Sequence, residues 1–274
     1  MKQVHIVSPS PRTGTTLLME LMVHGFVFDG HADHELEVVY APDPPVDRFC
    51  SKNPANLKFA LPLLKRRPEL WVICVLRDPR DVVVSRHSKR PEAYWAHFGF
   101  FRDRMGDFRA ARGHERFLVV RYEDLVADPD AVQAELQAAI PFLEKRRDFS
   151  SFHEFAAPTS RAVEALGGVR AISADGIGRW KSELPRLKAQ IERYGDIDEL
   201  LIELGYERDQ SWKRLLDGVE PDNGKSYFED RSPRPLARRL KLRLRRDLLF
   251  WRAMLGFPAK HPIIVTPGGV REHI

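Results

Sequence analysis

Short apolar runs alternate with segments of helical character along the first half of the chain. The run at residues 4–7 (VHIV) is followed by a polar loop and then by an apolar segment at 17–23 that lacks Gly and Pro. The run at 70–76 is apolar at every position, as in a strand buried on both faces of a parallel sheet. A third run at 117–121 precedes a helical segment at 128–139. This order predicts an α/β fold with a mostly parallel central sheet.

The loop at residues 8–16 (SPSPRTGTT) joins the first predicted strand to the first predicted helix and has the composition of an anion cradle. Such a loop leaves the first amides of the helix unpaired, and the helix dipole adds positive charge there. Gly14 permits close approach of the backbone to a ligand, Thr15 and Thr16 add hydroxyls, and Arg12 adds a permanent cation. The loop predicts a phosphate or sulfate site, with a plain helix-capping turn as the alternative.

The Walker A pattern GxxxxGK[ST] is the obvious comparison, and this loop departs from it at two fixed positions. When the two are aligned on Gly14, Pro9 replaces the first glycine and Thr15 replaces the lysine. The cation lies instead two residues before the glycine, at Arg12. We therefore expect a relative of the P-loop enzymes that is not a nucleoside triphosphatase.

A second motif, RDPRDVVVSRH at residues 77–87, follows directly on the strand at 70–76. Its Asp-Pro pair is placed to cap and begin a helix. Arg77 then lies at the carboxyl end of a parallel strand, where ligands of open α/β sheets bind, and Ser85 follows two turns later. Taken alone, the motif is also compatible with a surface ion pair between Arg77 and Asp81.

The two motifs in this order resemble those of the sulfotransferases that use 3′-phosphoadenosine 5′-phosphosulfate (PAPS). Residues 11–16 are similar to the 5′-phosphosulfate loop of that family, and residues 77–85 to the motif whose Arg and Ser bind the 3′-phosphate. FLVVRYEDL at 117–125 resembles the strand whose tyrosine lies near the adenine, and GRWK at 178–181 resembles a segment that closes over the donor. The resemblance covers residues 3–206 and favours the bacterial and carbohydrate-type members over the cytosolic small-molecule type.

The resemblance implies a P-loop-like three-layer fold, PAPS as donor, the bisphosphate PAP as product, and no required metal ion. It implies these donor-binding residues: Arg12, Thr13, Gly14, Thr15, Thr16, Arg77, Ser85, Tyr122, Arg179 and Trp180. Many members have Lys at the position of Arg12. Arginine keeps the positive charge but donates a proton less readily than lysine does. The cytosolic members also have Arg-Lys-Gly where this chain has Ser-Ala-Asp at 173–175. Arg161 and Arg170 are candidate replacements for those missing cations.

The segment at residues 29–47 contains three prolines and a close group of His and acidic side chains, and we expect it to lack regular structure. In the family that it resembles, this region faces the acceptor, and transfer to a hydroxyl needs a general base. Glu35 is the first candidate for that base and His34 the second, with His31 and Glu37 as further alternatives. A metal site is compatible with these residue types but ranks below the base.

Three later segments add to the predicted site. Lys52 begins a KNP sequence similar to the Lys-x-Pro of carbohydrate-type members, which makes it a candidate for stabilising charge on the transferring group. The aromatic-rich segment at 91–112 predicts a helix whose aromatic side chains form either core or an acceptor wall. Residues 141–176 are irregular in pattern and predict a mobile cover over the site.

Composition limits the remaining classes. The chain has 274 residues, two cysteines and no apolar run near the roughly 18 residues of a membrane-spanning helix. Because a strand follows the first residue directly, without the pattern of a signal peptide, we expect a cytoplasmic protein without disulfides.

The net charge of +5 is unevenly distributed along the chain. Residues 231–274 hold 11 basic and two acidic side chains, so the rest of the chain is slightly acidic, which gives no support for nucleic-acid binding. We predict a catalytic domain at 1–206 and a basic extension at 207–274, with an amphipathic helix at about 235–255. Its apolar stripe comprises Ala237, Leu240, Leu244, Leu248, Trp251 and Leu255. Packing or self-association is one use of such a helix, and an anionic membrane surface is the other.

The sequence therefore predicts a sulfotransferase acting on a hydroxyl, less readily on an amine, of a carbohydrate, glycolipid or small molecule. Two other classes stay open. An ATP-dependent metabolite kinase of the P-loop class would need Mg²⁺ and a Walker lysine. A non-catalytic donor-binding protein would dock through its basic tail and would not depend on Glu35 or His34.

Overall fold

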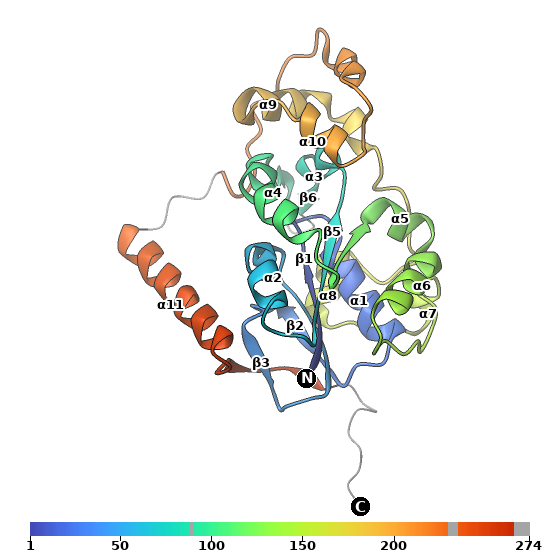
Figure 1. Cartoon of the computed structure of the whole chain (residues 1–274). Helices are drawn as coiled ribbons and strands as arrows, with labels where there is room; N and C mark the ends of the chain where they lie inside the picture. Colours follow the sequence, from blue (N-terminus) through green and yellow to red (C-terminus); the bar gives the residue numbers. More distant parts are fainter. Residues whose placement is uncertain (88–89, 230–234, 266–274) are drawn as a thin grey trace, which may run out of the picture.

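A six-stranded sheet forms the centre of the protein in the computed structural model, which describes residues 1–87, 90–229 and 235–265 (Figure 1). The strands lie in the order β10 (Ile264–Val265), β2 (Gly30–Glu35), β4 (Arg48–Lys52), β1 (Lys2–Val7), β5 (Leu70–Leu76) and β8 (Phe117–Arg121). All neighbours pair in parallel except β10 and β2. The predicted α/β fold with a mostly parallel sheet is confirmed.

The pairing register places the carboxyl ends of the central strands at one edge of the sheet. Ile6 of β1 is opposite Lys52 of β4, and Leu76 of β5 is opposite Arg121 of β8. On the far side of β4, Glu35 of β2 is also opposite Lys52. The segments that follow these strands therefore start close together.

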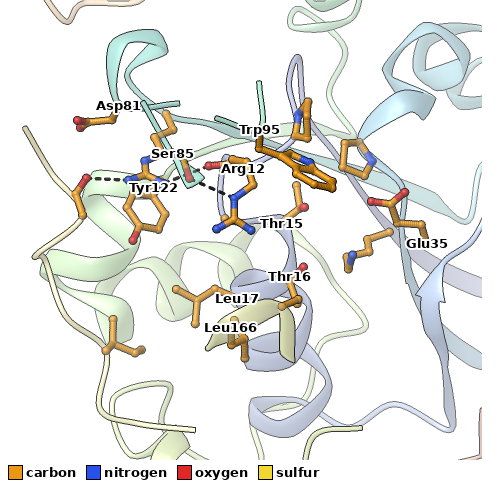
Figure 2. Close-up of a pocket in the computed structure, with 18 of the residues that line it drawn as sticks. Arg12, Thr15, Thr16, Leu17, Glu35, Asp81, Ser85, Trp95, Tyr122 and Leu166 are labelled. Carbon is orange, nitrogen blue, oxygen red and sulfur yellow. Dashed lines mark hydrogen bonds between the residues drawn. The ribbon is translucent and has the colours of Figure 1, made fainter. Parts of the chain in front are cut away.

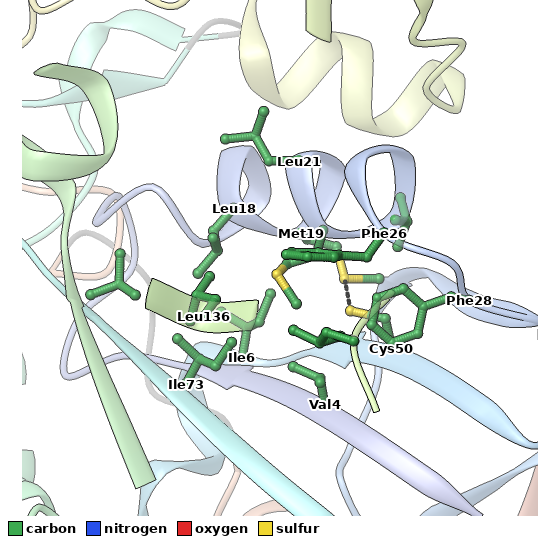
Figure 3. Packing of buried hydrophobic residues seen from close by; sticks show 14 of the residues in the cluster. Val4, Ile6, Leu18, Met19, Leu21, Phe26, Phe28, Cys50, Ile73 and Leu136 are labelled. Atoms are coloured by element: carbon green, nitrogen blue, oxygen red, sulfur yellow. Dashed lines mark hydrogen bonds between the residues drawn. The ribbon is translucent and has the colours of Figure 1, made fainter. Parts of the chain in front are cut away.

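Helices cover both faces of the sheet, which explains why β5 is apolar throughout. Ile73 and Val75 face the cluster under α1 (Thr15–Gly25) and α6 (Pro129–Ala139), whereas Val72 and Cys74 face α2 (Leu57–Leu64) and α4 (Gly99–Ala111). Figure 3 shows α1 resting on β1 and β5 through its apolar side chains, among them Leu18. Full burial of one such side chain contributes about 1.5–3 kcal/mol.

A third cluster lies beyond α3 (Pro79–Val83). It combines the short helical turn η2 (Arg179–Ser182), α9 (Leu184–Tyr194), α10 (Asp198–Glu203) and η3 (Ser211–Leu216). The buried Arg80 guanidinium lies 4.1 Å from the ring centre of Trp180 and 5.0 Å from that of Trp212, and it pairs with Asp78 at 2.8 Å and Glu207 at 2.5 Å. Residues on both sides of the predicted boundary at 206 thus meet around one arginine.

Several connecting segments differ from expectation. Residues 29–47 contain β2 and also β3 (Tyr40–Asp43), which pairs with β9 (Ala259–Pro262), so the expected lack of regular structure is wrong. The expected helix at 91–112 begins only at Gly99, because residues 90–94 form β7 (Arg90–Tyr94) beside β6 (Arg86–His87). The remaining elements are η1 (Pro54–Asn56), α5 (Tyr122–Ala127), α7 (Phe152–Phe155) and α8 (Ser160–Leu166).

The last helix, α11 (Leu236–Met254), runs along the outside of the layer formed by α2 (Figure 1). The ring of Phe250 stacks on that of Phe59 in α2 with 5.0 Å between centres, and Ala253 is buried. Within the described part of the chain, no helix is both long and apolar enough to cross a membrane. The end of the predicted extension, residues 266–274, lies outside the described residues.

Candidate functional site

The loop at residues 8–14 turns the chain from β1 into α1. Arg12 has φ 72° and Gly14 has φ 97°, and the left-handed conformation costs a residue other than glycine about 1–2 kcal/mol. The Thr13 hydroxyl donates to the Ser10 carbonyl at 3.3 Å and so holds the turn. No side chain among the described residues caps the first turn of α1. Its amides are therefore available to an anion.

The ring of Tyr122, the first residue of α5, fits between two glycines. A Cβ at Gly14 would lie 2.5 Å from Tyr122 Cδ2, and a Cβ at Gly176 would lie 3.0 Å from the Tyr122 hydroxyl oxygen. The guanidinium of Arg77 lies 4.2 Å from the centre of the same ring. Glycine at 14 is thus required both by the backbone conformation and by the approach of the ring.

Arg77 links three segments of the chain. Its Nη1 donates to the Arg12 carbonyl at 3.1 Å, and its Nη2 donates to the Gly176 carbonyl at 2.7 Å. Asp81, the candidate ion-pair partner in the sequence, accepts instead from the backbone amides of Gly178 at 2.8 Å and Trp180 at 3.0 Å. Both contacts tie the segment after α8 to the motif at the end of β5.

The side chain of Arg12 reaches the second motif. Its Nε donates to the Ser85 hydroxyl at 3.1 Å, and its Nη2 donates to the Arg86 carbonyl at 3.3 Å. Burial, together with the positive charge of Arg77, lowers the pKa of Arg12. Two arginines held this close favour an anion between or beside them, because each charge raises the electrostatic potential at the other.

A cavity of about 910 Å³ opens at this edge of the sheet, a size typical of ligand sites. Its cationic lining residues are Arg12, Lys52, Arg77, Arg104, Arg170 and Arg179. Its acidic lining residues are Glu35, Asp81 and Asp175. The excess of positive charge suits a ligand that carries several negative charges.

Glu35 lies at the opposite end of this cavity from Tyr122, with Arg12 and Thr15 between them (Figure 2). Lys52, at the end of β4, is only 6% exposed. Burial lowers the pKa of Lys52, whereas the neighbouring carboxylate of Glu35 favours its charged form. A poorly hydrated cation at this position binds an anionic oxygen more strongly than a surface lysine would.

The candidate bases separate into two groups by position. His34 and Glu35 both line the cavity. Burial, and then the charge of Lys52, lowers the pKa of His34, so its imidazole is neutral at pH 7 and can accept a proton. His31 and Glu37 do not line the cavity. The carboxylate of Glu37 accepts a hydrogen bond from the side-chain amide of Asn56 at 2.6 Å.

Aromatic side chains form one wall near Glu35. Trp95, Phe100 and Phe228 line the cavity. The ring of Trp95 is stacked on that of Tyr227 with 4.4 Å between centres, and Phe228 meets Phe100 edge to face at 5.1 Å. The other phenylalanines of α4, at 101 and 108, belong to the core. Part of the aromatic segment therefore belongs to the core and part lines the cavity, and its use as an acceptor wall stays a prediction.

Two predicted donor-binding residues do not line the cavity. The side chain of Thr13 is fully buried inside the loop, and Trp180 is 4% exposed in the cluster around Arg80. Arg179 does line it. Of the two candidate replacement cations, Arg170 lines the cavity, whereas Arg161 pairs with Asp33 at the surface at 3.0 Å.

Sequence reasoning missed Arg104 and Phe228. Arg104 donates to the Pro9 carbonyl at 3.2 Å and lies one helical turn after Phe100, so a helical projection of α4 could have placed the two side chains on one face. Phe228 comes from the predicted extension and carries no local signal for this position. No group of three His, Cys, Asp or Glu side chains arranged to hold a metal ion occurs among the described residues.

Residues 24–144 match the model of the sulfotransferase family. This region is similar to the sulfotransferases. It contains Lys52, Arg77, Ser85 and Tyr122, whereas the loop with Arg12 precedes it. The resemblance seen in the motifs is therefore confirmed for a little under half of the chain. No curated protein matches the sequence significantly.

Solved sulfotransferase structures resemble the chain at low identity. A mouse sulfotransferase complexed with PAP is 16% identical, with 79% of this chain and 88% of that chain covered and a TM-score of 0.44. The sulfotransferase domain of the Synechococcus PCC 7002 olefin synthase is 15% identical, with 66% and 88% covered and a TM-score of 0.43. A sulfotransferase from Alicyclobacillus acidocaldarius is 14% identical, with 78% and 99% covered and a TM-score of 0.36.

Proposed function

We propose that this protein transfers the sulfuryl group of PAPS to a hydroxyl of a carbohydrate, glycolipid or small-molecule acceptor. One observation carries the proposal. Two loops whose sequences resemble donor-binding motifs, 73 positions apart, meet through the Arg12–Ser85 hydrogen bond beside a cavity lined by an excess of cations. The Arg77 side chain binds the backbone of the same Arg12.

The residues around this contact fit the donor. The first amides of α1, with Arg12, Thr15 and Thr16, would hold the 5′-phosphosulfate, since they combine a helix N-terminus with a cation and two hydroxyls. Arg77 and Ser85 would hold the 3′-phosphate, and Tyr122 would lie near the adenine. Arg77 Nε is buried and has no hydrogen-bond partner among the described residues, so it has a donor free for a phosphate oxygen.

The proposed chemistry is an in-line displacement at sulfur. Glu35 or His34 takes the proton of the acceptor hydroxyl, whose oxygen then forms a bond to sulfur. The bond between sulfur and the bridging phosphate oxygen breaks, and its electron pair stays on that oxygen of PAP. Arg12 and the amides of α1 stabilise the charge on this oxygen, and Lys52 stabilises the charge on the sulfuryl oxygens. Most of the rate enhancement then comes from positioning and electrostatics.

Calorimetric titration tests the donor. We expect the protein without Mg²⁺ to bind PAP tightly and ADP weakly, and Arg77→Ala to weaken PAP binding by about 10- to 100-fold, the loss expected for hydrogen bonds to a charged group. Arg161→Ala is the matched control, because Arg161 pairs with Asp33 outside the cavity. Equal binding of the two nucleotides, or ADP binding that requires Mg²⁺, would reject the proposal in favour of a kinase.

Turnover needs a separate measurement. We expect PAPS carrying radioactive sulfur to release labelled sulfate slowly by itself and to label an acceptor when hydroxyl compounds are screened. PAP binding without any label transfer or PAPS hydrolysis, unchanged by Glu35→Gln and His34→Gln, would instead identify a non-catalytic donor-binding protein.

A further inference from the structure

Helix α11 carries two apolar stripes, and only one of them packs on the protein. The inner stripe, Leu249, Phe250, Ala253 and Met254, lies on the core cluster of α2 and α4. The outer stripe consists of Leu240, Leu244, Leu248, Trp251 and Leu255. Its spacing of four, four, three and four residues places these five side chains on one face of the helix, turned away from the inner stripe.

The outer stripe is exposed along its whole length. Leu240 is 49% exposed, Leu244 65%, Leu248 62%, Trp251 60% and Leu255 71%. At 1.5 Å per residue these positions extend over about 22 Å. Phe257, just beyond the helix, is also 70% exposed. A continuous apolar surface of this length on a protein marks an interaction site.

A row of cations flanks the outer stripe on one side. With 100° between successive residues, Lys241, Arg245 and Arg252 project along this flank, whereas Arg239 and Arg243 project farther round the helix, towards the side of the inner stripe. All five are exposed. The single acid of the helix, Asp247, lies 3.8 Å from Arg243. An apolar stripe beside a row of cations, on a helix with a large excess of positive charge, matches the boundary between the acyl chains and the headgroups of an anionic bilayer.

We propose that α11 docks the protein on an anionic phospholipid bilayer, with the outer stripe among the acyl chains and the flanking cations on the lipid phosphates. A second copy of the chain is a poor partner for the outer stripe, because two outer stripes in contact would bring two strongly cationic helices together and they would repel each other. Packing on the protein itself is already provided by the inner stripe. The inner stripe also holds the helix to the body of the protein, so docking would keep the whole molecule at the membrane.

Vesicle co-sedimentation of the full chain tests the proposal, and it does not depend on sulfuryl transfer. We expect binding to vesicles of phosphatidylcholine with about 30% phosphatidylserine, little binding to pure phosphatidylcholine, and weaker binding as salt rises. The double variants Leu244→Glu/Leu248→Glu and Lys241→Glu/Arg245→Glu should each reduce partitioning more than about tenfold. Their thermal unfolding should match that of the unsubstituted protein, since all four side chains are exposed.

Leu215→Glu is the matched control, because Leu215 is 47% exposed in η3 and lies outside α11, and it should leave vesicle binding unchanged. Equal binding to neutral and anionic vesicles, or binding to neither, would overturn the proposal. A second result would also overturn it: the protein forms a dimer in sedimentation velocity, Leu244→Glu/Leu248→Glu dissociates this dimer, and the protein does not bind vesicles. The outer stripe would then contact a second copy of the chain.

Discussion

The Nε atom of Arg12 lies 3.1 Å from the hydroxyl oxygen of Ser85, and this hydrogen bond joins the loop after β1 to the end of the motif after β5. Because Arg77 donates to the carbonyl of the same Arg12, the backbone and the side chain of one residue are both held by the second motif. The two halves of the proposed donor site are thus coupled by direct contacts of one residue.

A double-mutant cycle measures this coupling. We expect Arg12→Ala and Ser85→Ala each to weaken PAP binding by about tenfold or more. The loss of binding free energy in the double variant should differ from the sum of the two single losses by about 0.5–3 kcal/mol. Arg12→Lys should retain much of the affinity, because it keeps the charge but loses the planar donor fork. Strict additivity in calorimetric titrations would contradict the coupling.

Gly14→Ala should destabilise the protein and weaken PAP binding together. The substitution forces alanine into φ 97° and places its Cβ 2.5 Å from the Tyr122 ring. We expect a loss of about 1–3 kcal/mol in urea unfolding. Gly167→Ala serves as the control, because Gly167 has φ 74° but open space around its Cβ position. If the two variants lose the same free energy, the contact with Tyr122 is not the cause.

Glu35→Gln should lower kcat by about 10²- to 10⁴-fold without changing PAP affinity, as expected when a general base is removed. For His34 the expectation concerns pH. Because burial and then the charge of Lys52 lower its pKa from the ordinary 6.5, the activity that depends on neutral His34 should rise with pH through a midpoint below 6.5. His34→Gln should remove this acidic limb. A larger loss of kcat in His34→Gln than in Glu35→Gln would identify His34, and not Glu35, as the general base.

His5 should make the fold sensitive to acid. Its side chain is fully buried against Ser51, and burial lowers its pKa from 6.5 to about 3. Between these values the unfolded chain binds a proton that the folded chain does not, so stability falls as the pH falls from 6.5 towards 3, by about 1.4 kcal/mol per pH unit. Urea unfolding of the unsubstituted protein and of His5→Gln at pH 7 and pH 5 checks this. An equal pH slope in both proteins would assign the acid sensitivity to other groups.

The backbone conformations of the two proposed donor-binding motifs were predictable because their signals are local. Asp78 caps the Arg80 amide at 2.9 Å, as the Asp-Pro pair indicates, and Gly14 has the left-handed conformation that a tight loop before a helix favours. The strand β2 was missed because four of the six residues at 30–35 (GHADHE) are polar and none is a β-branched or aromatic strand former. It forms because it pairs with β4, a tertiary contact that outweighs its weak propensity.

The wall of the cavity shows where local reasoning stops. Phe228 reaches the site because the segment after η3 folds back so that Tyr227 stacks on Trp95. Trp180 sits in a motif similar to one that covers the donor, yet it is buried beside Arg80. Both positions follow from the packing of segments that are far apart in the sequence, which no local pattern contains. Their roles in donor and acceptor binding stay predictions.

The pair between Arg80 and Glu207 has a consequence for anyone who wishes to shorten the chain. Arg80 is 3% exposed and belongs to the same motif as Arg77. A fragment ending at residue 206 would lose the Glu207 carboxylate and the Trp212 ring beside that guanidinium, and with them Phe228 of the cavity wall. We therefore expect the smallest useful fragment for expression or crystallisation to end no earlier than residue 229, because it then keeps Glu207, Trp212 and Phe228 beside the residues that they contact.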